Sequence, residues 1–527
     1  MKKQSLLKGA FVLTLASFIT RILVLVNSMV QARVLGSEGI GLKMMVMPLM
    51  GLLVTLTTVG LPVAISRLVA EADAQGNGAK VKKILIVSST ITGSLSVAVV
   101  ALAIFCGNAF SAYFLTDQRS YYSFMALIPI VPIVAVSGIL KGYFRGMQTM
   151  NPLALSQVIE QTVRISATYL LVRWLIPLGI EYAAAGAVFS TVLGEAVSLS
   201  YLIAAFKLSH HRKFHVPNSL WRKVSKGKVI FFELLQTALP TMGNGLIFSL
   251  SKAVQPMIIT KSLALAGLSS AVIAKDYGML TGFVMPLLFF PGFINQSLGV
   301  TLVPAISEAS AKDNVRLIHR RIFQALCVAL SIGVPSTMLL YLFAPELMTV
   351  IYKSPQAAPL LKFIAPFFLL HYFQTPLQSA LIGLGRAKTA MFNNMIAKGA
   401  TLVFIYPLAA HFGLGIYGVM LALSIGVILE TLLHVFAVYK LIGLYFHYAE
   451  IVKILLAGII MGYGGKLIVT YLNYTDLQLG LTTILAIIFS VLIYLLILVY
   501  FRVIRRADIG KIPFIGRILV LLFPVRR

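Results

Sequence analysis

Residues 480–502 read GLTTILAIIFSVLIYLLILVYFR, an apolar run whose first charged residue is the closing Arg502. A helix crosses the hydrocarbon core of a bilayer with about 20 apolar residues, so this run is long enough to span a membrane. Scanning outward for comparable runs gives thirteen more. The fourteen predicted spans are residues 8–32, 44–70, 83–107, 121–144, 152–176, 183–206, 229–256, 271–303, 319–343, 358–383, 390–411, 415–439, 451–472 and 480–502. The sequence therefore predicts an all-α polytopic membrane protein with 14 transmembrane helices.

The composition supports a membrane protein and excludes an ordinary soluble enzyme. Of the 527 residues, 59% are hydrophobic and 11% are charged, whereas soluble proteins have about 25% charged residues. The mean hydropathy is +0.93. Lys and Arg number 44 against 16 Asp and Glu, which gives a formal net charge of +28. Such an excess suggests nucleic acid in a soluble protein, but little soluble surface remains here, so no nucleic-acid partner is expected.

Most of the basic residues are explained by membrane orientation. The N-terminus, the loops after even-numbered spans with the adjoining span ends, and the tail hold 31 of the 44, a set that includes Lys141 near the end of span 121–144. The loops on the opposite side hold nine, among them Lys43. Cytoplasmic loops carry the excess of Lys and Arg. Both termini and the basic loop 207–228 are therefore predicted to be cytoplasmic.

An internal repeat is indicated by matches at an offset of 241 residues. Leu61, Ile65 and Ser66 recur as Leu302, Ile306 and Ser307, and Gly142 and Arg145 recur as Gly383 and Arg386. The offset covers six spans, so the two copies have the same orientation and form two parallel six-helix lobes around a central cavity. The predicted parts are an N-lobe at 1–206, the basic loop at 207–228, a C-lobe at 229–440, two appended helices at 441–503 and a basic cytoplasmic tail at 504–527.

Four basic residues that belong to neither orientation set lie inside predicted spans, where a charge costs at least about 2.5 kcal/mol and marks a partner or a wet cavity. They are Arg21, Arg164, Lys252 and Lys398. Their helices correspond between the two halves and carry polar side chains at helical spacing. This pattern predicts an anion-binding cavity, because Arg and Lys bind phosphate oxygens. The predicted cavity residues are Arg21, Asn27, Arg33, Arg164, Lys252, Lys275 and Lys398.

Three acidic residues within spans are candidates for ion coupling. Glu160 is four residues from Arg164, so the two side chains can pair, and Glu195 and Glu430 lie on corresponding spans. Each glutamate could instead neutralise the basic residues. His371 is a candidate proton relay, although the favoured interpretation is a core histidine whose ring is satisfied by its neighbours. No nucleotide-binding loop, catalytic elbow or metal motif is present, so no catalytic residue, cofactor or metal site is expected.

Five segments are informative beyond their hydropathy: ITRIL at 19–23, ARVLG at 32–36, GLPVAIS at 60–66, YFRGMQ at 143–148 and GIEYAAAG at 179–186. They resemble the stage V sporulation protein B family, within the polysaccharide-transporter branch of the multidrug/oligosaccharidyl-lipid/polysaccharide exporter superfamily. The resemblance covers at least residues 8–440. It implies a two-lobed flippase for spore cortex formation, whose cargo is an undecaprenyl-diphosphate-linked peptidoglycan or oligosaccharide precursor.

The resemblance also implies roles for residues of the first span. Related lipid II flippases carry essential arginines there; Arg21 matches the first of them, and Asn27 replaces the next. The expected partners of the protein are the lipid-linked saccharide, membrane lipids and cortex-synthesis enzymes. The expected location is the cytoplasmic membrane, with the forespore outer membrane as a candidate site. Two alternatives stay open: a cation- or proton-coupled multidrug antiporter, and a non-transport scaffold that recruits cortex enzymes through loop 207–228.

Overall fold

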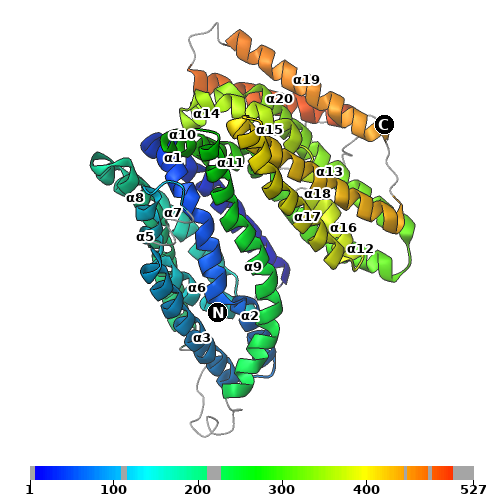
Figure 1. The fold of residues 1–527 in the computed structure, drawn as a ribbon. Helices are drawn as coiled ribbons and strands as arrows, with labels where there is room; N and C mark the ends of the chain where they lie inside the picture. Colours follow the sequence, from blue (N-terminus) through cyan, green and yellow to red (C-terminus); the bar gives the residue numbers. More distant parts are fainter. Residues whose placement is uncertain (1–5, 108–114, 211–226, 444–447, 473–477, 502–527) are drawn as a thin grey trace. The chain divides into compact units, whose positions relative to one another are not determined.

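The computed structural model describes residues 6–107, 115–210, 227–443, 448–472 and 478–501, and within these ranges the regular secondary structure is helical (Figure 1). The tail at 504–527 and most of the basic loop at 207–228 lie outside the described residues. The chain divides into two compact units, residues 1–282 and 283–527. Each unit is described by itself below.

Unit 1 is built from long helices that pack side by side. The α7–α8 pair and the α1–α7 pair have the most extensive packing in this unit. Its helices are α1 (Leu6–Thr58), α2 (Leu61–Ala74), α3 (Gly78–Phe105), α5 (Ser120–Leu127), α6 (Ile130–Gly146), α7 (Asn151–Leu175), the short 3-10 helix η1 (Ile176–Leu178), α8 (Ile180–His210), α9 (Gly227–Leu265) and α10 (Ser270–Gly278). A π-helical turn, η3 (Met279–Val284), continues α10 past the end of the unit at residue 282.

Unit 2 has the same helical character with more interruptions. It consists of α11 (Met285–Phe289), η4 (Phe290–Gly292), α12 (Phe293–Ala311), α13 (Val315–Leu342), α14 (Ala344–Tyr352), η5 (Pro355–Ala357), α15 (Ala358–Phe368), α16 (His371–Gly383), α17 (Ala387–Tyr406), η6 (Pro407–His411), α18 (Gly415–Ile442), α19 (Tyr448–Leu472) and α20 (Leu479–Tyr500). The last two helices pack on each other, and α19 also packs on α13.

The helices confirm an all-α membrane protein. Among the described residues, nine helical stretches are long and apolar enough to cross a bilayer. One of them, Leu15–Thr58, includes two predicted spans. The predicted spans outside the nine coincide with α7, α9, α15 with α16, and α17. The structure is therefore consistent with fourteen spans, some of which carry too many polar residues or breaks to be recognised by apolarity alone.

Helix α1 joins the first two predicted spans without a loop. The sequence predicted a connection over residues 33–43, but helix continues through it and is broken only at Gly36, with φ 73° and ψ 176°. The bend brings Lys43 back to Gln31, whose side-chain oxygen Oε1 lies 2.8 Å from Lys43 Nζ. Along a straight helix twelve residues rise about 18 Å, so this contact requires the bend.

The predicted internal repeat recurs as packing inside each unit. The buried residues Leu61, Ile65, Ile139 and Leu140 of unit 1 correspond at the offset of 241 to Leu302, Ile306, Ala380 and Leu381, which are buried together in unit 2.

Close helix approach is repeated as well. A Cβ at Gly142 would lie 2.8 Å from the Pro62 main-chain oxygen, and one at Gly383 would lie 3.0 Å from that of Val303, at the same offset. The repeat is thus structural. The predicted lobe boundaries at 206 and 229 stay predictions.

We expect Gly36→Ala to destabilise the protein through the backbone alone. Essentially only glycine adopts the backbone conformation of Gly36. Any other residue held in this conformation is strained by about 1–3 kcal/mol. A Cβ there would meet nothing within 4 Å, so no steric clash contributes. Thermal unfolding of the purified protein in detergent measures the effect.

Gly51→Ala is the matched control. Gly51 lies in the same helix, also with nothing within 4 Å of an added Cβ, and alanine is favoured over glycine in a helix by about 1 kcal/mol. Equal unfolding temperatures for the two variants would contradict the strain at Gly36.

Candidate functional site

The first charged pair inside the membrane lies on α7. Arg164 Nη2 donates to Glu160 Oε1 at 2.5 Å, and both side chains are mostly buried. The predicted pairing of these two residues is therefore present. The Nε atom of Arg164 is buried and has no hydrogen-bond partner among the described residues. One side of the guanidinium thus neutralises Glu160 while another N–H donor is left unused.

A second pair connects α6 to α8. Lys141 Nζ lies 2.8 Å from Glu195 Oε1, and the Glu195 side chain is 7% exposed. Glu195 also interacts with Glu160 of the neighbouring helix. The two helices can come this close because Gly194 has no side chain. A Cβ at this position would lie only 2.8 Å from the Glu160 main-chain oxygen. Lys141 was counted with the cytoplasmic basic residues although it lies in the predicted span 121–144, and the structure places it inside α6 with a carboxylate partner.

Lys43 is a third membrane-buried base of unit 1. The residue is 4% exposed and lies within α1, where its ammonium donates to Gln31. Arg164 is the charge that acts on it electrostatically. Its assignment to a polar loop was wrong, since the chain turns at Gly36 instead of looping and keeps Lys43 in the helix.

Unit 2 has a charged pair on the helices that correspond to α7 and α8. Lys398 Nζ of α17 lies 3.5 Å from Glu430 Oε2 of α18. The sequence offers Lys398 no acid within one helical turn, and the partner comes instead from the next helix. His371 Nδ1 lies 2.6 Å from Gln374 Oε1, as expected for a satisfied core histidine. His434, a residue that sequence analysis did not single out, is buried beside Glu430 and hydrogen-bonds to its main-chain oxygen.

The other predicted cavity residues have diverse surroundings. Asn27 is 7% exposed, and its Oδ1 has no hydrogen-bond partner among the described residues. Arg21 of α1 and Lys275 of α10 are half-buried, and Arg33 is exposed. Lys252 of α9 is exposed, with Nζ 4.4 Å from the centre of the Phe248 ring. All of these residues lie in unit 1 and Lys398 lies in unit 2, so a common cavity stays a prediction.

A charged cluster near the bend of α1 was missed by sequence analysis. Arg119 donates to Asp117 Oδ2 at 2.8 Å and to Glu38 Oε1 at 2.7 Å. The hydrogen bonds with Asp117, reinforced by those with Glu38, raise the pKa of Arg119 above the ordinary arginine value. The cluster holds the start of α5 against α1, and Ser120 adds a hydrogen bond to the Leu42 main-chain oxygen. A scan of charges along the chain could not reveal the whole cluster, because Glu38 and Arg119 are 81 residues apart.

Comparison with known proteins identifies the family. Residues 6–310 match the model of a family described as polysaccharide biosynthesis protein, and residues 280–407 match the MatE family. Stage V sporulation protein B of Bacillus subtilis (strain 168) is 42% identical over 521 residues, which cover 99% of this chain and 100% of that protein. The chain belongs to the stage V sporulation protein B family. The resemblance seen in the sequence is thereby confirmed.

Two further comparisons relate this family member to flippases. Lipid II flippase MurJ of Bacillus subtilis (strain 168) is 27% identical over 425 residues, covering 76% of this chain and 77% of that protein. A solved structure of lipid II flippase MurJ in an inward closed conformation matches with a TM-score of 0.68 at 16% identity, covering 93% of this chain and 99% of the other. At that identity the structural match establishes the fold.

We expect the ion pair between Lys141 and Glu195 to contribute to stability. Removing one partner of a buried pair costs about 3–5 kcal/mol, because the other charge is left uncompensated. Because the Lys141 side chain is a quarter exposed, the cost of Lys141→Met should lie near the lower end of this range. We expect this variant to reduce the unfolding temperature by several degrees. The double variant Lys141→Met/Glu195→Gln should recover part of the loss.

The matched control is Lys312→Met. Lys312 also pairs with a glutamate, Glu308, but both side chains are about two-thirds exposed, and solvent screens such pairs. Its unfolding temperature should be nearly unchanged. A double variant no more stable than Lys141→Met would argue against an electrostatic role for the pair.

Proposed function

We propose that this protein is a flippase that moves an undecaprenyl-diphosphate-linked peptidoglycan or oligosaccharide precursor across the cytoplasmic membrane by alternating access. Its role is in spore cortex synthesis, and it acts as a transporter that forms no covalent intermediate and needs no cofactor. The family membership, the similarity to a lipid II flippase and the repeated helical architecture support this proposal.

The observation that carries the proposal is the set of basic side chains kept inside apolar helices of both units. Arg164 and Lys398 lie on corresponding helices, and each has a glutamate partner. Charged residues within a membrane are costly and mark substrate pathways. A diphosphate presents several anionic oxygens, which a planar guanidinium binds in pairs and an ammonium binds as a point charge.

Arg21 and Asn27 are the proposed head-group contacts on α1. They are joined in this role by Arg33, Arg164, Lys252, Lys275 and Lys398, while the prenyl chain stays in the lipid. Glu160, Glu195 and Glu430 each have a basic neighbour. In the proposed cycle these acids compensate the bases once the diphosphate has left, which assists the return of the empty transporter.

The proposed orientation places both termini in the cytoplasm. Lys43 and Lys141 belong to membrane helices, which removes one basic residue from each of the two orientation sets and leaves the large imbalance in place. The precursor then enters from the cytoplasmic leaflet, where lipid-linked precursors are assembled. Cortex-synthesis enzymes are the proposed consumers of the flipped product, and the forespore outer membrane is the proposed site.

We expect Arg21→Ala to reduce flipping at least tenfold while leaving protein abundance unchanged, because the first head-group contact is lost. The measurement is transbilayer movement of a labelled undecaprenyl-diphosphate saccharide in vesicles that contain the purified protein. Arg67→Ala is the control, since Arg67 is exposed on α2 and pairs with Glu71 one turn away. Normal flipping by the Arg21 variant would overturn the assignment.

Replacing loop 207–228 with a short neutral linker distinguishes the flippase hypothesis from the scaffold hypothesis. A scaffold that recruits enzymes through this loop loses its function completely. For a flippase we expect vesicle flipping to persist in the molecules that insert correctly, with lower abundance, because the loop contributes basic orientation signals. The antiporter hypothesis makes a different prediction: a cation or proton gradient should drive export of cationic dyes by the unchanged protein.

A further inference from the structure

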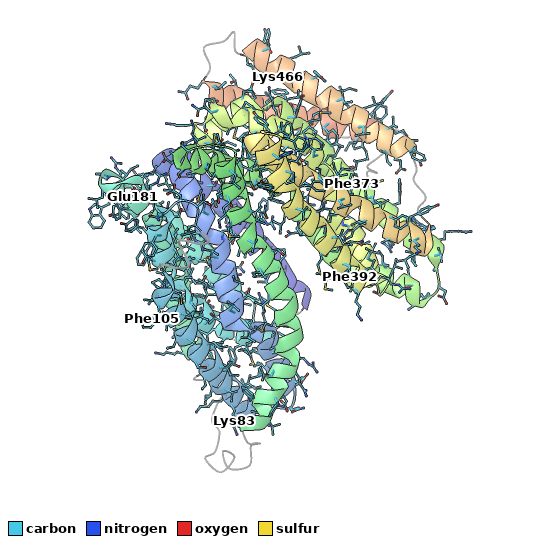
Figure 2. All side chains as sticks on the ribbon, viewed as in Figure 1. Lys83, Phe105, Glu181, Phe373, Phe392 and Lys466 are labelled. Carbon is cyan, nitrogen blue, oxygen red and sulfur yellow. The ribbon has the colours of Figure 1, made fainter. Side chains whose placement is uncertain are left out.

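Three helices of unit 1 meet where the bend of α1 faces the starts of α5 and α8. A Cβ at Gly39 of α1 would lie 3.2 Å from Ile180 Cγ1 of α8, and α5 packs on both helices. Each of these segments follows an odd-numbered predicted span, so in the proposed orientation they lie outside the cytoplasm. Glu181, at the start of α8, lies at the opposite end of unit 1 from Lys83 of α3 (Figure 2).

A guanidinium with unused donors lies at this outer end. Arg119 donates through Nε and Nη2 to Asp117 and through Nη1 to Glu38, over 2.7–3.2 Å. A guanidinium has five N–H donors, so one on each Nη atom is left without an acceptor in the described part of the chain. The side chains of Arg119 and Glu38 are 34% and 32% exposed. A ligand can therefore reach both N–H donors and carboxylate acceptors.

Two tyrosines continue this surface. Tyr122 lies three residues after Arg119, whose backbone is already helical, so the two side chains share a face of α5. The ring centroids of Tyr122 and Tyr182 are 4.8 Å apart, with 47° between the ring planes. These residues are 43% and 37% exposed. We call Glu38, Arg119, Tyr122 and Tyr182 the outer surface of unit 1.

The chemistry of the outer surface favours a neutral sugar. A sugar hydroxyl both donates and accepts hydrogen bonds, and the C–H face of a sugar ring packs against an aromatic ring. Arg119 carries one positive charge, while Asp117 and Glu38 carry two negative charges, so the charged group has a net charge of −1. Such a group repels phosphate. Tyrosines also anchor helices at the membrane interface, but the negative charge disfavours anionic lipid head groups.

We propose that the outer surface of unit 1 binds the saccharide part of the cargo. The rings of Tyr122 and Tyr182 pack against the sugar, and Arg119 and Glu38 hydrogen-bond to its hydroxyl groups. For its ligand this inference rests on the proposed function. The site holds the saccharide on the outer side of the membrane and leaves the diphosphate to basic side chains elsewhere.

The test is saturation-transfer NMR of di-N-acetylchitobiose with the purified full-length protein in detergent. We expect saturation transfer from the unchanged protein, and at least a fivefold loss per folded molecule in Tyr122→Leu/Tyr182→Leu, because leucine removes the ring faces. Tyr122→Phe/Tyr182→Phe retains the rings and should keep most of the signal. No saturation transfer from the unchanged protein would overturn the proposal, as would an equal signal from the leucine variant.

Tyr417→Leu is the matched control. Tyr417 begins a membrane helix, is 40% exposed and contacts an aromatic ring, that of Phe363 at 5.4 Å between centroids. That neighbour is apolar, so this variant should keep the full signal. An equal loss in Tyr417→Leu would show that any exposed ring binds the sugar and would overturn the assigned site.

Flipping in vesicles connects the site to the cargo. The leucine variant of Tyr122 and Tyr182 should move an undecaprenyl-diphosphate disaccharide several times more slowly than the unchanged protein, and should move undecaprenyl diphosphate without a sugar at the same rate. Equal slowing of both lipids would contradict a saccharide site. Because sugar binding is measured without transport, its absence contradicts this inference alone, whereas absence of flipping by the unchanged protein contradicts the proposed function.

Discussion

Hydrocarbon offers no hydrogen-bonding partner, so every charge that this chain carries into the membrane must be satisfied by the chain itself or by what it binds. Helices satisfy their own backbone, which explains why the described residues are helical. Side chains need neighbours. The ion pairs that join α6 to α8 in unit 1 and α17 to α18 in unit 2 help to fix which helices pack and in which register.

Close packing is the means by which those partners meet. Gly194 lets α8 approach α7 beside Glu160, and Gly142 and Gly383 allow the equivalent approach of α6 to α2 and of α16 to α12. Small residues at helix contacts are the usual route to association within a bilayer, where apolar surface gives no driving force. Glycine and charge thus act together. The glycines allow short distances between helices, and at those distances the charged side chains can reach their partners.

The sequence predicts those features that depend on local composition or helical spacing. Apolar runs of about 20 residues predicted the membrane spans. The four-residue spacing of Glu160 and Arg164 predicted that their side chains pair, because both residues lie on one helix. Lys398 and Glu430 are 32 residues apart, and only the packing of α17 on α18 joins them. Lys43 was misplaced because a charge next to an apolar run has the same pattern in a loop and in a buried helix end. Gly36 was missed because a single glycine changes the chain direction without any polar loop.

The two halves share a backbone pattern and differ in how their ion pairs would respond to motion. In unit 1 both members of the Arg164–Glu160 pair belong to α7, so sliding α7 along α8 leaves that pair intact. In unit 2 the members of the Lys398–Glu430 pair belong to different helices, so the same movement separates opposite charges. The same sliding movement therefore separates an ion pair in unit 2 and preserves one in unit 1, so the two copies of a duplicated architecture differ in the electrostatic cost of that movement.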